Sequence, residues 1–136
     1  GRLANLQAAV LNVKMKYFEN DILRRQEVAK KYTERLKSYI KTPVIQDDRT
    51  SVWAQYTVRV KERDNLQERL KMAGIPTAVH YPIPMHLQEC FAYLGYKKGN
   101  FPISETCANE VMSLPMNPLL EDQEIDYITT TLLKLI

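Results

Sequence analysis

An uninterrupted helical pattern from residue 3 to about residue 40 constrains the fold more than any other feature of the sequence. Neither glycine nor proline interrupts it, and apolar residues recur at steps of three and four: Leu3, Leu6, Val10, Val13, Tyr17, Ile22, Ala29, Tyr32, Leu36 and Ile40. A single helix of that length far exceeds the usual ~11–12 residues. It is therefore two helices, or it packs against something larger than this chain. The pattern slips near Asn20-Asp21, which predicts a kink or a new N-cap at Asp21.

The composition is that of one ordinary globular domain. The chain has 136 residues, of which 45% are hydrophobic and 26% charged, a balance that disfavours disorder and suffices for one core. No apolar run approaches the ~18 residues of a membrane span, and residues 1–5 show no secretory signal pattern. The two cysteines, Cys90 and Cys107, form no disulfide framework. We therefore expect a cytoplasmic protein.

Positive charge is concentrated in the first third of the chain. Residues 1–41 contain ten Lys or Arg and four Asp or Glu, a net charge of +6, whereas residues 42–136 contain nine and twelve, a net charge of −3. A basic stretch of this kind can contact nucleic acid or a nucleotide phosphate. The simpler interpretation is a solvated helix face, and we favour it, so nucleic acid is not the expected partner.

Residues 42–136 alternate between strand and helix patterns. Thr42-Pro43 ends the first helical run, and residues 52–60 then alternate between apolar and polar side chains, as a strand does. Further elements are predicted in this order: a helix over 62–73 ended by Gly74, a strand over 76–81, a short helix from about 87 to 94, a helix capped by Ser104 that runs to about Met112, an extended piece at Leu114-Pro115-Met116, and a last helix starting near Glu121-Asp122. This order predicts an α+β fold, in which a long N-terminal helix and further helices pack on a small, mostly antiparallel sheet.

The segment from His80 to His86 is the densest group of candidate binding residues. It contains both histidines and two of the seven prolines, and it follows a predicted strand, where functional residues are common. In an unbroken strand His80 and Tyr81 point to opposite faces, so only a bend at Pro82 lets both reach one ligand. His86 and Cys90 share a helix face and His80 could join them, but zinc then lacks a fourth ligand. No metal site is predicted.

No complete set of catalytic residues is present. The four glycines, at positions 1, 74, 95 and 99, form neither a phosphate-binding loop nor a dinucleotide-binding motif. Ser38-Tyr39-Ile40-Lys41 fits the pattern S-x-x-K, but the S-D-N element that penicillin-recognising enzymes also need is absent. No serine nucleophile motif and no carboxylate pair stands out either. We therefore assign no catalytic residue in this chain.

Several blocks of the sequence nevertheless match one enzyme family, in the family's order. The most specific is Gly74-Ile75-Pro76-Thr77 followed by His80-Tyr81-Pro82-Ile83-Pro84-Met85-His86-Leu87-Gln88, which fits the pattern G-I-x-T-x-x-H-Y-P-x-P-x-H-x-Q. Further matches are Gly1-Arg2-Leu3 with Leu6 to Leu11, Arg24 or Arg25 with Ala29 and Tyr32, Phe101-Pro102 with Ser104-Glu105, and Ser113-Leu114-Pro115-Met116. The chain resembles the C-terminal part of the pyridoxal-phosphate (PLP)-dependent nucleotide-sugar aminotransferases of the DegT/DnrJ/StrS type. Within this family, the chain most resembles the bacterial enzymes that aminate UDP-linked keto sugars during the synthesis of surface polysaccharides.

The resemblance implies a fold and a division of the chain. The fold is the small C-terminal domain of a type I, aspartate-aminotransferase-like enzyme. Residues 1–41 then form the long interdomain and dimer helix, kinked near residue 20, and residues 42–136 form the small α/β domain. The large PLP-binding domain is absent from this chain.

The resemblance also implies a cofactor and substrate contacts. PLP serves the parent enzyme, and in the family its Schiff-base lysine lies upstream. None of the eleven lysines here has the family's Ser-x-x-x-x-Lys context, so no cofactor is expected on this chain alone. By matching position, Arg2, His80 and Tyr81 are nucleotide-sugar contacts and His86 lines the site. Arg2 would neutralise a phosphate or uronate oxygen, and His80 and Tyr81 would donate hydrogen bonds to sugar or diphosphate oxygens.

Two hypotheses of different classes follow. In the first, the chain is a piece of a longer aminotransferase, is inactive alone, and contributes substrate binding and dimer contacts; its start on Gly1 without methionine favours this. In the second, it is a free-standing, non-catalytic binding or assembly module that keeps the fold. A reading frame that continues upstream into a lysine-bearing PLP domain supports the first, and a native start codon near Gly1 supports the second. Under both, the apolar face of the first helix (Leu6, Val10, Val13) is expected to drive self-association.

Overall fold

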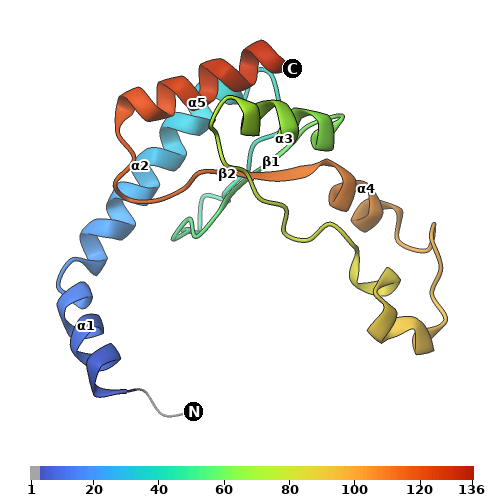
Figure 1. Cartoon of the computed structure of the whole chain (residues 1–136), viewed down its shortest axis with the longest axis horizontal. Helices are drawn as coiled ribbons and strands as arrows, with labels where there is room; N and C mark the ends of the chain where they lie inside the picture. Colours follow the sequence, from blue (N-terminus) through green and yellow to red (C-terminus); the bar gives the residue numbers. More distant parts are fainter. Residues whose placement is uncertain (1–3) are drawn as a thin grey trace.

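The computed structural model describes residues 4–136, which form helices around a two-stranded sheet (Figure 1). The elements in chain order are α1 (Asn5–Met15), α2 (Phe18–Leu36), β1 (Tyr56–Arg59), α3 (Arg63–Met72), the 3-10 turns η1 (Met85–Leu87) and η2 (Glu89–Leu94), α4 (Pro102–Glu110), β2 (Val111–Leu114) and α5 (Asp122–Leu135). The predicted α+β class, with helices on a small antiparallel sheet, is confirmed. Among the described helices, none is long and apolar enough to cross a membrane.

The long helical pattern corresponds to two helices. α1 ends at Met15 and α2 begins at Phe18, with Tyr17 between them at φ −108° and ψ −2°. The N-cap predicted at Asp21 is wrong, because Asp21 lies inside α2 and donates its backbone N–H to the Tyr17 carbonyl at 2.9 Å. α1 has no buried residue, so packing against the core of the described chain does not fix the direction of α1 relative to α2. Figure 1 shows α1 extending away from that core.

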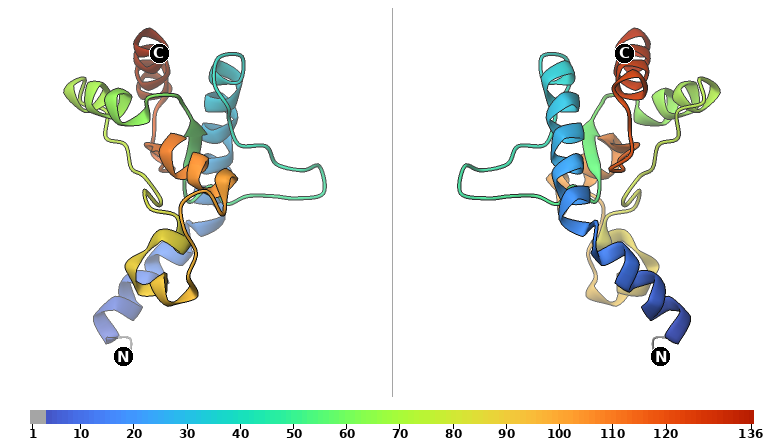
Figure 2. Two further views of the ribbon diagram at one scale, coloured as in Figure 1. Left: turned by 90° about the vertical axis from the view of Figure 1, so that its right-hand side faces the viewer. Right: turned by 90° about the vertical axis from the view of Figure 1, so that its left-hand side faces the viewer.

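The sheet is smaller than the sequence predicts. β1 and β2 pair antiparallel, with Tyr56 opposite Leu114 and Arg59 opposite Val111. The strand expected over 52–60 is shortened because Trp53 has φ +49°, outside the extended region, and the chain around it forms a projecting loop (Figure 2). Of the strand expected over 76–81, only a bridge between Ala78 and Ser113 forms.

The core lies on one face of this sheet. Alternate strand residues point toward the helices, and α2, α3 and α5 supply the rest of the cluster. Its largest fully buried side chains are Tyr32, Tyr56, Leu36, Leu70, Met112, Ile125, Leu132, Val28 and Val58. Thr57 and Ser113 occupy the opposite face, where their hydroxyl oxygens lie 2.9 Å apart. This second face meets the segment that begins at Ala78.

Residues 76–107 form an arm that extends from the core on the side opposite to α1: in Figure 1, α1 lies at the lower left and the arm at the lower right. No residue between 76 and 107 is buried. The helix predicted over 87–94 is present only as η1 and η2, which are 3-10 turns. α4 runs from Pro102 to Glu110, so the cap predicted at Ser104 is wrong and the helix ends two residues before the predicted end near Met112. Met112 belongs to β2, where pairing with Val58 and burial override its local helical preference.

Candidate functional site

His80 is attached to the polar face of the sheet. Ala78 exchanges two backbone hydrogen bonds with Ser113, of 2.8 and 3.2 Å, which fixes the chain two residues before His80. The Ser113 hydroxyl then lies 3.4 Å from His80 Nδ1 and 2.9 Å from the Thr57 hydroxyl. Since Ser113 is buried, its hydroxyl is a fixed partner, and the imidazole of His80 is oriented by the sheet.

His80 and Tyr81 lie beside one cavity. The peptide bond between them is cis. Their rings meet edge to face, with centroids 6.0 Å apart and an interplanar angle of 89°. Both line a cavity of about 250 Å³ together with Met85, Gln88 and Cys107. The sequence predicts that only a bend at Pro82 lets the two side chains reach one ligand, and in the structure both line this cavity. Tyr81 is 74% exposed, so its phenol is available to a molecule outside this chain.

His86 lies apart from that pair. Its side chain is only 8% exposed, and its Nε2 lies 3.0 Å from Oε1 of Glu105. The ring also packs on Phe101, with centroids 4.8 Å apart. His86 is not among the residues that line the 250 Å³ cavity. The predicted role of His86 in lining the substrate site therefore stays a prediction, and the structure gives its imidazole a partner within the arm.

Glu105 is a functional candidate that its residue type alone does not single out. Partial burial raises the pKa of Glu105, but hydrogen bonds from the Gly99 backbone, from His86 and from the Phe101 backbone outweigh it and hold the pKa below its usual value. The carboxylate is thus ionised at neutral pH. The one signal that could have found it is the F-P-x-x-E block, in which Glu105 is the acidic position. Ser113 and Cys107 were also missed as neighbours of His80, because only the tertiary structure brings them there.

The remaining predicted contact, Arg2, lies outside the described residues. For metals, the described part of the chain brings together no three His, Cys, Asp or Glu side chains that could hold an ion. Cys90 and Cys107 are both free.

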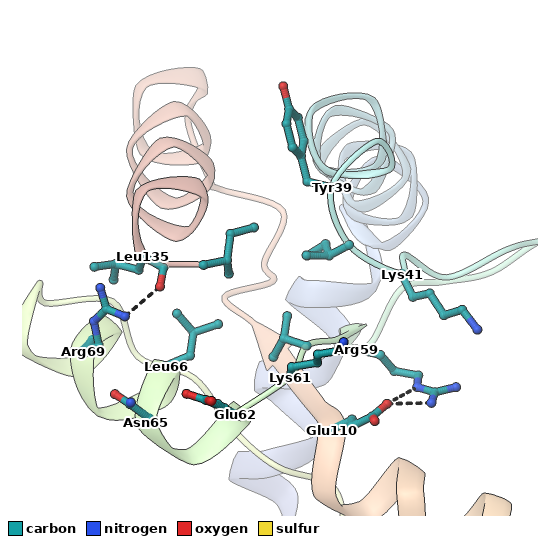
Figure 3. Close-up of a pocket in the computed structure, with 13 residues that line it drawn as sticks. Tyr39, Lys41, Arg59, Lys61, Glu62, Asn65, Leu66, Arg69, Glu110 and Leu135 are labelled. Carbon is teal, nitrogen blue, oxygen red and sulfur yellow. Dashed lines mark hydrogen bonds and ion pairs between the residues drawn. The ribbon is translucent and has the colours of Figure 1, made fainter.

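A larger cavity of about 650 Å³ lies between α3, the segment that follows α2, the end of β1 and the end of α5, and it contains none of the predicted site residues (Figure 3). Its charged side chains are partly engaged already. Arg59 pairs with Glu110 through two hydrogen bonds of 3.0 and 2.6 Å, and Arg69 donates to the Leu135 carbonyl at 2.7 Å. Figure 3 shows both arrangements at the edges of the cavity.

The described residues do not fit a PLP site. A Schiff-base lysine must meet the cofactor inside a pocket, with a partner for the pyridine nitrogen. Lys31 is half-buried but paired with Asp122, and every other lysine of the chain is exposed. Lys41 and Lys61 border the larger cavity, where the nearby carboxylate of Glu110 is bound to Arg59. No reaction step is therefore assigned to this chain.

The protein has recognisable relatives over nearly its whole length. It is 42% identical over 128 residues to the dTDP-3-amino-3,6-dideoxy-alpha-D-galactopyranose transaminase of Aneurinibacillus thermoaerophilus, covering 93% of this chain and 35% of the relative. It is 46% identical over 132 residues to the UDP-2-acetamido-2-deoxy-3-oxo-D-glucuronate aminotransferase of Pseudomonas aeruginosa, covering 96% and 36%. The chain thus spans about a third of the length of these curated relatives.

A solved structure agrees with the sequence matches. The Streptomyces venezuelae protein DesV, solved in complex with a ketimine intermediate, superposes with a TM-score of 0.89 at 35% identity. The superposition covers 96% of this chain and 36% of DesV. Residues 1–133 also match the sequence profile of a single family. The chain therefore belongs to the DegT/DnrJ/EryC1/StrS aminotransferase family.

Proposed function

We propose that this chain is the C-terminal part of a PLP-dependent aminotransferase that moves an amino group, from glutamate, to a keto sugar carried on a nucleotide. The observation that carries the proposal is the family match over residues 1–133 together with His80 and Tyr81 beside one cavity. In the whole protein, PLP would supply the electron sink and the amino-group carrier that transamination needs. The lysine that holds it would lie outside this chain.

The relatives narrow the substrate that we propose. The names of the two curated relatives place the amino or keto group at carbon 3 of a sugar on UDP or dTDP. We therefore propose a nucleotide-linked 3-keto sugar as the acceptor. A phenol and an imidazole suit such a substrate, because both donate hydrogen bonds to sugar hydroxyls and diphosphate oxygens. Tyr81 and His80 are assigned this role, and Arg2 the neutralisation of an anionic oxygen.

The proposed partner of α1 is a second copy of the chain, or the large domain in the parent enzyme. Leu6 is 78% exposed, Val10 53% and Val13 57%, which is unusual for apolar side chains on one helix. A homodimer of the parent enzyme and self-association of this piece are proposed on that basis. A cytoplasmic location is proposed as well, supported by the free thiols of Cys90 and Cys107.

A free-standing binding or assembly module is the alternative proposal. It rests on the exposed apolar face of α1, the surface through which such a module would pair. Such a module would keep the fold and pair through α1 without catalysing transamination.

The first experiment titrates the purified chain with PLP, followed by borohydride reduction and intact mass spectrometry. We expect no defined absorbance change and no stoichiometric adduct on a single lysine. A stoichiometric adduct on one lysine would mean that this chain has its own cofactor site, contrary to the proposal.

The second experiment tests the activity directly. A chimera joins this chain to the part of the Pseudomonas aeruginosa relative that it does not match. We expect glutamate-dependent amination of a UDP-linked 3-keto sugar by the chimera and none by the chain alone. Tyr81→Phe should raise KM for the sugar about fivefold to tenfold with kcat nearly unchanged, whereas Tyr93→Phe, at a tyrosine that is 79% exposed in η2, should not. A well-folded chimera with bound PLP and no activity would favour the binding module.

A further inference from the structure

The carboxylate of Glu105 accepts hydrogen bonds from three other residues in the part of the arm farthest from the core. Oε1 of Glu105 lies 3.0 Å from His86 Nε2, 2.8 Å from the Gly99 nitrogen and 3.3 Å from the Phe101 nitrogen. Oε2 lies 3.0 Å from the same Gly99 nitrogen. The donors come from η1, from the turn at Gly99, and from the residue that precedes α4. Glu105 therefore ties three places in the chain to α4.

Hydrophobic burial does not fix this part of the molecule. No residue between 76 and 107 is buried, so the shape of the arm depends on a small number of polar and aromatic contacts. Two aromatic contacts in the arm join the same residues. His86 packs on Phe101, and Phe101 meets Tyr96 edge to face at 5.0 Å. The carboxylate of Glu105 stands at the centre of this group.

The segment that carries Tyr81 is held at its two ends. At the first end Ala78 is paired with Ser113 of β2, and His80 lies beside the Ser113 hydroxyl. At the second end His86 is bound to Glu105 of α4. The residues between these anchors are exposed or half-buried. Losing either anchor would free one end of the segment.

We propose that Glu105 is a positioning residue for the substrate-binding segment, holding His86 and thereby fixing the place from which Tyr81 meets the nucleotide sugar. The ligand named here rests on the proposed function, whereas the anchoring of the arm does not. In this arrangement the imidazole of His86 joins η1, to which it belongs, to Glu105 of α4. A side chain that is 8% exposed has little surface to offer a substrate.

The arrangement also determines which nitrogen of His86 carries its proton. An ionised carboxylate only accepts hydrogen bonds, so the Nε2 that faces it must carry a proton. Without the Glu105 carboxylate this constraint on Nε2 is removed. The tautomer of His86 therefore reports on its contact with Glu105. A general loss of stability would not change it.

The test uses the 136-residue chain and three variants. Glu105→Ala removes every acceptor oxygen, Glu105→Gln keeps one oxygen and removes the charge, and Glu89→Gln is the matched control at an exposed glutamate of the same arm. Hydrogen exchange is followed at the amides of Gly99 and Phe101, with Met112 of the core as reference. Imidazole nitrogen NMR reports the tautomer of His86.

In Glu105→Ala we expect exchange at Gly99 and Phe101 to accelerate about tenfold or more, with Met112 unchanged. Glu105→Gln should accelerate it less, and Glu89→Gln not at all. The His86 signal should shift from the Nε2-protonated form to a mixture in Glu105→Ala. Unchanged exchange at both amides would overturn the proposal, as would equal acceleration at Met112, which would indicate general unfolding.

In the chimera, Glu105→Ala should raise KM for the nucleotide sugar about tenfold with a smaller change in kcat, and Glu105→Gln should recover part of the loss. A fall in kcat at constant KM would contradict the positioning role. If the chimera is inactive while the exchange and tautomer results hold, the proposed function fails and the anchoring of the arm stands.

Discussion

The phenol of Tyr32 donates a 2.9 Å hydrogen bond to the carbonyl oxygen of Pro115 and so joins α2 to the segment that follows β2. The Tyr32 ring is fully buried and packs on Tyr56 of β1, with centroids 5.0 Å apart. Tyr56 in turn shares a 2.7 Å hydrogen bond with Thr33 of α2. The two phenols thus connect α2 to β1 and to the segment that follows β2, which keeps the polar face of the sheet, and His80 on it, in a fixed place.

Replacing Tyr32 by phenylalanine isolates this hydrogen bond. Tyr32→Phe leaves the ring in the core but leaves the Pro115 carbonyl without its phenolic donor, so the free energy of unfolding should fall by about 1 kcal/mol. Urea denaturation followed by circular dichroism measures the change. Tyr17→Phe, at a tyrosine that is 62% exposed, is the control and should unfold like the wild type. Equal stability of the two variants would show that the bond contributes nothing.

Alkaline pH should destabilise the fold through the same two tyrosines. Burial raises the pKa of Tyr32, and the charges of Glu124 and Tyr56 raise it further. Burial also raises the pKa of Tyr56, although hydrogen bonds from Thr33 and Thr42 oppose this. Because the folded pKa is the higher one, the stabilisation is complete below the unfolded value of about 10 and is lost as pH rises above it.

The measurement is the melting temperature between pH 8 and pH 11 (pH values chosen to bracket the phenol pKa of about 10). The wild type should lose stability steeply over this range, and a Tyr32→Phe, Tyr56→Phe double variant should lose less. Tyr93→Phe, an exposed change, should keep the wild-type slope. If the melting temperature of the double variant falls with pH as steeply as that of the wild type, other groups cause the alkaline transition.

The contact between α2 and α5 should carry much of the stability of the domain. Leu132 of α5 is fully buried in the core, so Leu132→Ala should reduce the free energy of unfolding by about 2–5 kcal/mol through lost burial and a residual cavity. Leu119→Ala, at a leucine that is 81% exposed, should change it by no more than about 0.5 kcal/mol. Denaturant titration of both variants checks the prediction, and similar losses at the two sites would contradict it.

The exposed face of α1 should associate with another copy of the chain at high protein concentration. A Val10→Glu, Val13→Glu double variant introduces repelling charges on that face and should shift light scattering toward the monomer mass. Met72→Glu, on an exposed methionine of α3, is the control and should not. A wild-type chain that stays strictly monomeric would count against association through α1.

Local sequence signals are sufficient to predict the helices whose apolar face packs on the core. The helix expected over 62–73 is α3, and Gly74 follows it at φ +75°, a conformation that glycine adopts without strain. The last helix starts at Asp122 as expected, where the carboxylate of Glu124 accepts the backbone N–H of Glu121 and closes the first turn. Each of these signals depends only on residues within one or two turns of the chain.

The motif blocks of the sequence also led to the family and to His80 and Tyr81 as neighbours of interest. Their order and spacing are properties of the sequence itself, so the family assignment required no coordinates. The tertiary structure decided how those residues are used. It places His80 against Ser113, which is distant in sequence, and it brings His86 within hydrogen-bond distance of Glu105.

The α+β class, the helices α3 and α5, and the family all follow from the order of residues along the chain. The ends of the strands, the break between α1 and α2, and the side chain that holds the arm depend on contacts made after folding. The physical reason is the range of the interactions concerned. Helix turns and caps join residues three or four apart, whereas the pairing of Val58 with Met112 and the bond of His86 to Glu105 join residues that only folding brings together.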